Sequence, residues 1–176
     1  VPTKNRVFNP DGDEFGTPEW VWKPWHELLN FVVDAAASDD VHLPFECYWT
    51  KEQDALGMAL GDWRQVATGL GGAIWLNPPY SRKAGPLYEW VLRARRESAM
   101  GCTICMLLPA DTSTEWCSLL WDRAGSWRPG VHGCFIEGRV KFIHPKTKLP
   151  TKNAPNFGSM IVVLTPAPPT TFQRPV

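Results

Sequence analysis

Four consecutive residues, Asn77, Pro78, Pro79 and Tyr80, have the types and spacing best suited to chemistry. The side-chain oxygen of Asn77 and the carbonyl of Pro78 can both accept hydrogen bonds from one amino group. Proline fixes φ and carries no backbone N–H, which leaves its carbonyl available to a ligand, and the ring of Tyr80 can stack on a planar group. The motif therefore predicts either a site for a planar molecule that carries an amino group or, equally well, a simple turn at a strand end.

Two predicted strands carry polar side chains at their ends. The apolar run Ala73–Leu76 follows two glycines and predicts a buried parallel strand that ends at Asn77. Phe31–Asp34 predicts a second buried strand, which ends in the carboxylate of Asp34 and is followed by the small residues 35–38. In open α/β sheets, ligands bind outside the carboxyl ends of the strands. Both side chains are therefore candidates for a binding site.

Capping patterns and apolar periodicity predict the surrounding elements. Thr17 and Pro18 fit the N-cap and first position of a helix that runs to about Asn30. The alternation of strands and helices indicates the α/β class with a mostly parallel sheet, and the pattern of residues 134–143 indicates antiparallel strands near the C-terminus. The other expected helices are 50–60, one from residue 86 and one from residue 112, and the other expected strands are 45–49, 103–108 and 159–164.

Length and composition indicate one domain. A chain of 176 residues with 44% hydrophobic residues can bury a core, and it lacks the run of about 18 apolar residues that a membrane span needs. We expect a flexible arm over residues 1–16, a single domain over residues 17–165 and a disordered Pro-rich tail over residues 166–176. The lack of a secretion-signal pattern and the odd number of five cysteines favour a soluble protein of the reducing cytoplasm.

Neither the cysteines nor the histidines predict a metal site. Cys102 and Cys105 have C-x-x-C spacing, but they lie in an apolar run in which alternation points them to opposite faces of a strand. We expect buried structural cysteines there. The four histidines show no ligand spacing, so no metal is predicted.

The charges are unevenly divided although their sum is zero. Residues 1–80 carry five Lys and Arg against twelve Asp and Glu, and residues 81–176 carry thirteen against six. Within the basic half, residues 144–156 hold Lys146, Lys148 and Lys152 with three prolines and no acid, which predicts an exposed basic loop. The asymmetry hints at a surface that faces a polyanion, whereas solvated charge is the simpler interpretation.

The order of the motifs resembles the DNA amino-methyltransferases that use S-adenosylmethionine. Thr17-Pro18, Asp34-Ala35-Ala36-Ala37 and Asn77-Pro78-Pro79-Tyr80 follow one another in this order, and the span from Thr17 to about Leu164 resembles the phage-type DNA N6-adenine methyltransferase (Dam) family. The chain departs from the wider superfamily in having Ala35 to Ser38 in place of a Gly-rich turn, and many relatives have Asp at the position of Asn77. The further matching residues are Asp54-Ala55-Leu56, Asp62-Trp63, Gly138-Arg139 with Phe142, and Gly158-Ser159.

The resemblance implies a doubly wound, mostly parallel, Rossmann-like methyltransferase sheet with an antiparallel strand near its C-terminal edge. It implies that S-adenosylmethionine lies against two groups of residues, the methionine end near Thr17, Pro18, Asp34 and Ala35, and the ribose and adenine near Asp54 and Asp62. Asn77 to Tyr80 match the catalytic motif, with Asn77 also beside the cofactor. DNA is the implied partner, in the cytoplasm of the host cell if the gene is phage-borne. The candidate phosphate contacts are Arg82, Lys83, Arg139, Lys141, Lys146, Lys148 and Lys152.

The implied reaction is methylation of adenine N6 in a base flipped out of the helix. Asn77 and the Pro78 carbonyl would accept the two N6 hydrogens while Tyr80 stacks on the base. Because an amide is a very weak base, methyl transfer is expected to precede proton loss. The alternatives are a protein glutamine-N5 methyltransferase, a cytosine-N4 methyltransferase, and a catalytically silent DNA-binding domain of the same fold.

Overall fold

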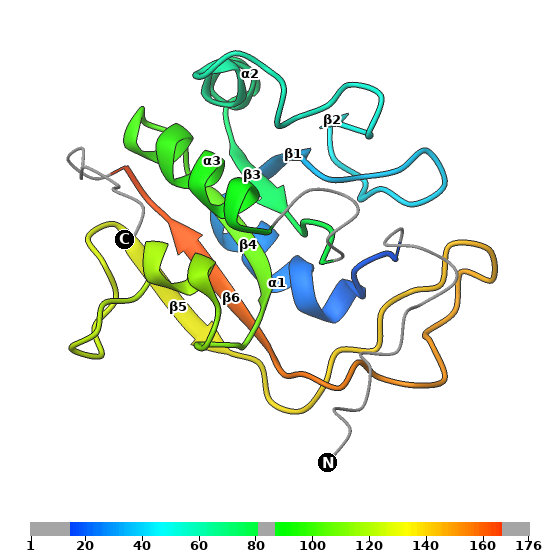
Figure 1. Cartoon of the computed structure of the whole chain (residues 1–176). Coiled ribbons are helices and arrows are strands. Elements are labelled where there is room, and N and C mark those ends of the chain that lie inside the picture. The colour runs from blue at the N-terminus through cyan, green and yellow to red at the C-terminus, as the bar shows by residue number, and fades with distance from the viewer. Residues whose placement is uncertain (1–14, 81–86, 167–176) are drawn as a thin grey trace.

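A six-stranded sheet forms the centre of the protein in a computed structural model that describes residues 15–80 and 87–166 (Figure 1). The strand order is β2-β1-β3-β4-β6-β5. β1 pairs in parallel with β2 and β3, β3 pairs in parallel with β4, and β6 is antiparallel to its neighbours β4 and β5. The strands are β1 Phe31–Asp34, β2 Cys47–Tyr48, β3 Ala73–Leu76, β4 Ile104–Pro109, β5 Val131–Phe135 and β6 Ser159–Leu164. The predicted α/β class, with a mostly parallel sheet and an antiparallel strand near the C-terminal edge, is confirmed.

Helices contact both faces of this sheet. Trp63 of α2 and Val91 of α3 belong to the same hydrophobic cluster as Leu76, whereas Val21 of α1 belongs to a second cluster that contains Trp75. Leu76 and Trp75 are neighbours on β3, and side chains alternate between the faces of a strand, so the two clusters lie on opposite faces. This arrangement is consistent with a Rossmann-like fold. The helices are α1 Glu19–Leu29, α2 Asp62–Leu70, α3 Leu87–Ala99 and the short 3-10 helix η2 Glu115–Leu119.

The start of α1 differs from the prediction in one functional detail. Pro18 has extended φ and ψ angles and occupies the N-cap of α1, and no side chain caps this helix end. The prediction that Thr17 is the N-cap is therefore wrong. The hydroxyl of Thr17 instead contacts a side chain of the candidate site, as described below.

The predicted helix over residues 50–60 is also wrong. The expected side-chain contact does form, because the backbone N–H of Thr50 donates to Gln53 Oε1 at 2.7 Å. The residues that follow nevertheless form turns, and the helix, α2, begins only at Asp62. The reciprocal contact satisfies one donor at a helix start, but it does not bring the carbonyls of the residues that follow into helical hydrogen bonds.

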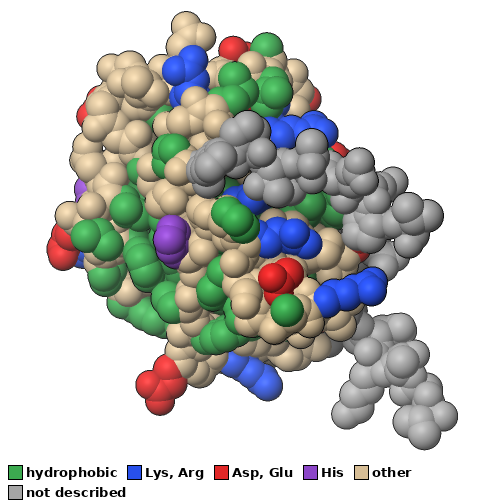
Figure 2. All heavy atoms as spheres, turned by 90° about the vertical axis from the view of Figure 1, so that its left-hand side faces the viewer, with side chains coloured by type: hydrophobic (Ala, Val, Ile, Leu, Met, Phe, Trp, Pro, Cys, Tyr) green, Lys and Arg blue, Asp and Glu red, His purple; other side chains and the backbone are tan. Residues whose placement is uncertain are grey.

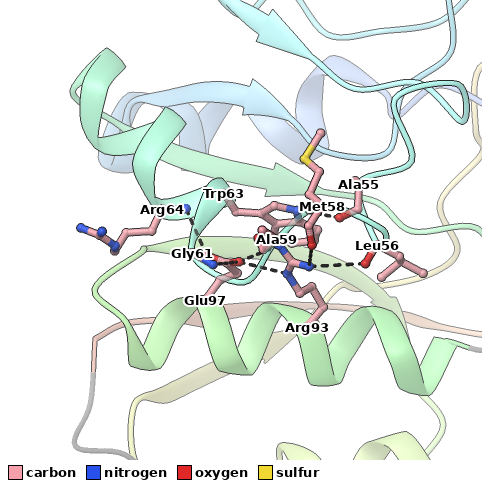
Figure 3. A network of polar contacts seen from close by, with 9 residues as sticks. All are labelled: Ala55, Leu56, Met58, Ala59, Gly61, Trp63, Arg64, Arg93 and Glu97. Atoms are coloured by element: carbon pink, nitrogen blue, oxygen red, sulfur yellow. Dashed lines mark hydrogen bonds and ion pairs between the residues drawn. The ribbon is translucent and has the colours of Figure 1, made fainter.

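Arg93 of α3 occupies several of those carbonyls (Figure 3). Its guanidinium donates to the carbonyls of Met58 at 2.6 Å and Ala59 at 2.7 Å, and it forms an ion pair with Glu97 at 2.8 Å. The guanidinium carbon also lies 5.2 Å from the ring centre of Trp63. Residues 55–61 are thus held as a loop against α3, because their carbonyls pair with a buried cation.

Glu97 also provides the cap that α2 lacks. Gly61, at the N-cap of α2, has a φ of 99° and no side chain with which to accept a hydrogen bond. Glu97 accepts the N–H of Gly61 at 2.8 Å through Oε1 and the N–H of Arg64 at 3.1 Å through Oε2. A carboxylate in this place satisfies two free donors and interacts favourably with the helix dipole. α2 therefore depends on a residue of α3 for its N-terminal cap.

Two further predictions hold only in part. The expected helix from residue 112 is the 3-10 helix η2, whose N-cap is Thr114, while Asp111 Oδ1 accepts hydrogen bonds from the N–H and hydroxyl of Ser113. The expected strand over residues 134–143 is confirmed as β5 only up to Phe135. Beyond it the chain turns at Gly138, which has a φ of 75°, and Ile143 forms isolated bridges with Gly16 and Pro150.

On the side of the molecule that faces left in Figure 1, several Lys and Arg side chains lie near one another in one half of the space-filling view (Figure 2). Acidic side chains are visible on the same side, so this side is not uniformly basic. Within the described residues, no helix is long and apolar enough to cross a membrane.

Candidate active site

A hydrogen-bonded corner follows the carboxyl end of β3. Asn77 Nδ2 donates to Thr17 Oγ1 at 3.2 Å, and the hydroxyl of Tyr80 lies 2.9 Å from Asn77 Oδ1 and 2.8 Å from the carbonyl of Leu107. A hydroxyl has one hydrogen, which these two acceptors share. Asn77 Oδ1 therefore keeps capacity to accept from a ligand, while its amide nitrogen is directed toward Thr17.

Three separate parts of the chain position this corner. β3 places Asn77 beside β4, which contains Leu107, and Thr17 immediately precedes the N-cap of α1. Gly16 and Ile143 exchange two backbone hydrogen bonds of 2.9 and 2.8 Å, which attach the residues before α1 to the segment that follows β5. The corner is therefore built by the sheet and by contacts between residues distant in sequence.

The ring of Tyr80 lies among other aromatic side chains. Phe157 approaches it edge-on with ring centres 5.7 Å apart, and Phe142 does so at 6.4 Å. The side chain is half-buried. Enclosure of its hydroxyl raises the pKa of Tyr80 well above its ordinary value, because burial disfavours the phenolate. Tyr80 is thus a neutral hydrogen-bond donor at physiological pH.

Asp34 ends β1, the strand next to β3, and its side chain is only 5% exposed. Its Oδ2 accepts the N–H of Leu43 at 3.1 Å. Burial raises the pKa of Asp34 to about 6, and hydrogen bonds from the N–H groups of Leu43 and Ala36 oppose that rise in part. The next residue, Ala35, donates its N–H to the carbonyl of Trp75 at 2.9 Å. Asp34 and Ala35 therefore lie on the same sheet edge as Asn77.

Asp54 and Asp62 lie on the segment that α3 holds. Asp54 is exposed with a φ of 47°, and its carbonyl accepts the N–H of Gly57. Asp62 is the first residue of α2 and follows Gly61, whose N–H is bonded by Glu97 in the second half of α3. The structure thus brings Thr17, Asn77 and Tyr80 into contact, with Pro18 and Asp34 adjoining, and places Asp54 and Asp62 on a different part of the fold.

The candidate phosphate-binding residues are spread along the C-terminal half. Arg139, Lys141, Lys146 and Lys152 are exposed. Lys148 is exposed as well, and its ammonium group donates to the carbonyl of Asp40, in the connection between β1 and β2. This contact places the basic loop 144–156 beside the loop that follows β1. Arg82 and Lys83 lie outside the described residues, as do residues 1–14 of the predicted arm and 167–176 of the predicted tail.

The cysteines are free thiols, and Cys102 and Cys105 are buried as predicted. Burial raises the pKa of Cys102 to about 12, so the thiol stays protonated. Over residues 15–80 and 87–166, no group of three or more His, Cys, Asp or Glu side chains is arranged to hold a metal ion.

Two parts of the corner were not predicted from the sequence. The carbonyl of Leu107 has no sequence signal, because every residue has one and only the pairing of β3 with β4 brings it to Tyr80. Phe157 contacts the ring of Tyr80 and directly precedes the Gly158-Ser159 pair. Its position as an aromatic residue beside a motif shared with the family is the signal that could have identified it.

Comparison with known proteins identifies the family of the chain. The family model described as DNA N-6-adenine-methyltransferase (Dam) matches residues 4–173, nearly the whole chain. No curated protein and no solved structure matches the chain significantly. The match covers the segments that carry Thr17, Asp34 and Asn77 to Tyr80, and the chain belongs to the DNA N-6-adenine-methyltransferase (Dam) family.

Proposed function

We propose that this protein methylates adenine N6 in DNA with S-adenosylmethionine and holds the flipped base at the Asn77 to Tyr80 corner. Family membership supports the reaction and the substrate. The observation that carries the assignment of the site is the orientation of Asn77, whose amide nitrogen is bonded to Thr17 and whose oxygen accepts from Tyr80. We further propose that the sheet is doubly wound and that the protein acts in the cytoplasm.

The oriented amide matches what adenine N6 requires. The N6 lone pair is delocalised into the ring, so the nitrogen becomes nucleophilic only when its two hydrogens are held out of the ring plane. Asn77 Oδ1 and the carbonyl of Pro78 would accept these two hydrogens and turn the lone pair toward the methyl donor. In the observed orientation Asn77 Nδ2 donates to Thr17 Oγ1, so that Oδ1 is the atom left to accept from the substrate; the opposite orientation would present N–H groups, which repel the amino group.

The residues near the corner fit S-adenosylmethionine. The cofactor carries an ammonium group. Asp34, which is only 5% exposed, offers a buried carboxylate at the end of the adjoining strand. An ammonium partner would favour the charged form of Asp34 and compensate for its desolvation. When bound, S-adenosylmethionine supplies an electrophilic methyl group. Thr17 and Pro18 would line the same end, and Asp54 and Asp62 are proposed near the ribose and adenine.

Base flipping gives the aromatic residues their role. Extrusion of a base costs a few kcal/mol, and stacking on an aromatic ring offsets about 1–3 kcal/mol of that cost. Tyr80 would provide the stacking surface, and Phe157 and Phe142 pack against it with their rings nearly perpendicular to its own. The shared hydrogen bond of its hydroxyl fixes the ring, so little side-chain entropy is lost when the base arrives.

Proton release does not need a basic side chain in this arrangement. Asn77 is an amide, Tyr80 is kept neutral by burial, and Asp34, at the end of the neighbouring strand β1, is hydrogen-bonded to the N–H of Leu43. The methylated N6 ammonium is acidic enough to lose its proton to water after methyl transfer. The exposed cations Arg139, Lys141, Lys146 and Lys152 are proposed to contact phosphates of the DNA backbone.

The proposal is tested by incubating the protein with unmethylated genomic DNA and S-adenosylmethionine carrying a labelled methyl group, followed by nucleoside chromatography. We expect the label in N6-methyladenine and at least a hundredfold loss of rate in Asn77→Ala with DNA affinity retained. Label in N4-methylcytosine or in a glutamine-containing peptide would establish one of the alternative activities instead. If the protein transfers no methyl group, binds no cofactor by calorimetry and still binds DNA, it is a catalytically silent DNA-binding domain.

A further inference from the structure

A groove of about 780 Å³ lies between α1 and the segment 139–150. Its α1 wall presents the indole of Trp20, which is 58% exposed. Tryptophan has the largest apolar side chain, so its exposure on a groove wall leaves a large apolar area in water. Such an area indicates that a partner binds there. The residues that line the groove are Pro18, Glu19, Trp20, Lys23, Pro24, Glu27, Arg139, Lys141, Ile143 and Pro150.

The two walls carry different chemistry. The wall from the segment 139–150 contributes Arg139 and Lys141, both exposed, and no acidic residue among those that line the groove. The α1 wall contains Glu19, Glu27 and Lys23, and Lys23 forms an ion pair with Glu19 at 2.5 Å. The groove therefore has a cationic side and, opposite it, an aromatic side that also carries the carboxylates of Glu19 and Glu27. Aromatic and cationic groups together bind nucleic acid strands through base stacking and phosphate contacts.

The groove is lined by residues that directly follow residues of the candidate active site. Pro18 lines it and directly follows Thr17, which bonds to Asn77. On the other wall, Ile143 lines the groove and directly follows Phe142, which contacts the ring of Tyr80. The backbone hydrogen bonds between Gly16 and Ile143 hold the two walls together. A strand whose base reaches the Asn77 corner would therefore have its neighbouring nucleotides close to the groove.

We propose that the groove binds the DNA strand beside the flipped adenine, with one flanking base stacked on Trp20 and a backbone phosphate held by Arg139 and Lys141. The proposal rests on the proposed function, because a base at the Asn77 corner identifies the occupant as DNA. It adds a residue, Trp20, that contacts the substrate outside the catalytic motif.

The stacking contact is tested by fluorescence anisotropy with short fluorescein-labelled single-stranded DNA, whose bases are free to stack on Trp20. We expect Trp20→Ala to weaken binding by about 5- to 150-fold, the range that corresponds to one stacked base. Trp20→Phe should restore most of the affinity. Leu28→Ala is the matched control, because Leu28 lies on the same helix and is 73% exposed but does not line the groove, and we expect it to bind like the wild type.

The phosphate contacts are tested by the salt dependence of binding. Replacing Arg139 and Lys141 together by Gln should lower the slope of log affinity against log salt by about one, because the one phosphate that these two side chains hold contributes about 0.9. Trp20→Ala should leave this slope unchanged, since stacking releases no counterions. An unchanged slope in the double variant would overturn the assignment of the cationic wall.

Three outcomes decide the proposal. If Trp20→Ala binds DNA like Leu28→Ala while the wild type methylates DNA, the groove is not a DNA site and the proposed function stands. If the wild type transfers no methyl group but Trp20→Ala weakens DNA binding as expected, the proposed function fails and the groove remains a DNA site. If Trp20→Ala changes the oligomeric state by light scattering and not the DNA affinity, the groove is an interface between copies of the chain.

Discussion

Replacement of Asp34 by Asn should stabilise the folded protein at neutral pH. Burial raises the pKa of Asp34 from 3.8 to about 6. Each pKa unit corresponds to 1.36 kcal/mol, so the ionised carboxylate costs about 3 kcal/mol in the folded state. Asn keeps an acceptor for the N–H of Leu43 but loses the hydrogen bond from Ala36, at a cost of about 1 kcal/mol. The expected net gain for Asp34→Asn at pH 7 is about 2 kcal/mol.

The pH dependence of this gain gives a test of its cause. Because the folded state holds the proton of Asp34 more tightly than the unfolded state, the wild-type contribution falls as the pH rises from about 4 to about 6 and is constant above that. Asp34→Asn lacks this titration. The two stability curves should therefore cross between about pH 4 and pH 5, with Asp34→Asn the less stable protein below the crossing.

Urea denaturation of both proteins between pH 4 and pH 8 measures this difference, with Asp39→Asn as a control at an exposed acid. Calorimetry with S-adenosylmethionine should show weaker binding to Asp34→Asn, because the charge that would pair with the ammonium group is gone. The reasoning is refuted if Asp34→Asn is no more stable than the wild type at pH 7 and the difference does not vary with pH.

Two further substitutions test the contacts of the corner and of α3. Thr17→Val removes the oxygen that accepts from Asn77 Nδ2 and should lower kcat about tenfold with little change in the KM for DNA. Thr17→Ser keeps that oxygen and should retain activity. Equal losses of kcat in both variants would contradict an orienting role for Thr17. Glu97→Gln leaves the charge of Arg93 buried and unpaired and should lower the free energy of unfolding by about 3–5 kcal/mol in urea. Replacing both residues by Met should not recover this loss, because the N–H groups of Gly61 and Arg64 would lose their acceptor and the carbonyls of Met58 and Ala59 their donor. A Glu97→Gln protein as stable as the wild type would show that the pair is not needed.

Local sequence rules predicted the strands and the polar corner. The bounds of β1, β3 and β6 agree with short apolar runs ending in a polar or turn residue, because such runs are buried wherever the sheet forms. The corner was predictable because its four residues are consecutive. The contact between Asn77 and Thr17 spans 60 residues, and only the packing of α1 beside β3 creates it.

The errors have the same physical origin. Residues 50–60 carry a capping box, but Arg93 binds the carbonyls of Met58 and Ala59 from 35 and 34 residues away. α2 escaped prediction because its N-cap, Gly61, offers no capping side chain, and the carboxylate that replaces one belongs to Glu97, 36 residues later. Capping patterns read along the chain cannot show a cap that is supplied by another helix.

The cap supplied by Glu97 has a consequence for the order of folding. α2 has nine residues, and isolated helices of that length are unstable in water, so α2 should form only when α3 has docked. The contact between Gly61 and Glu97 closes a chain loop that contains β3 and the Asn77 corner. α2, β3, the corner and α3 should therefore exchange their amide hydrogens as one cooperative unit. The Asn77 corner therefore reaches its catalytic geometry in the same folding step that stabilises α2 and α3.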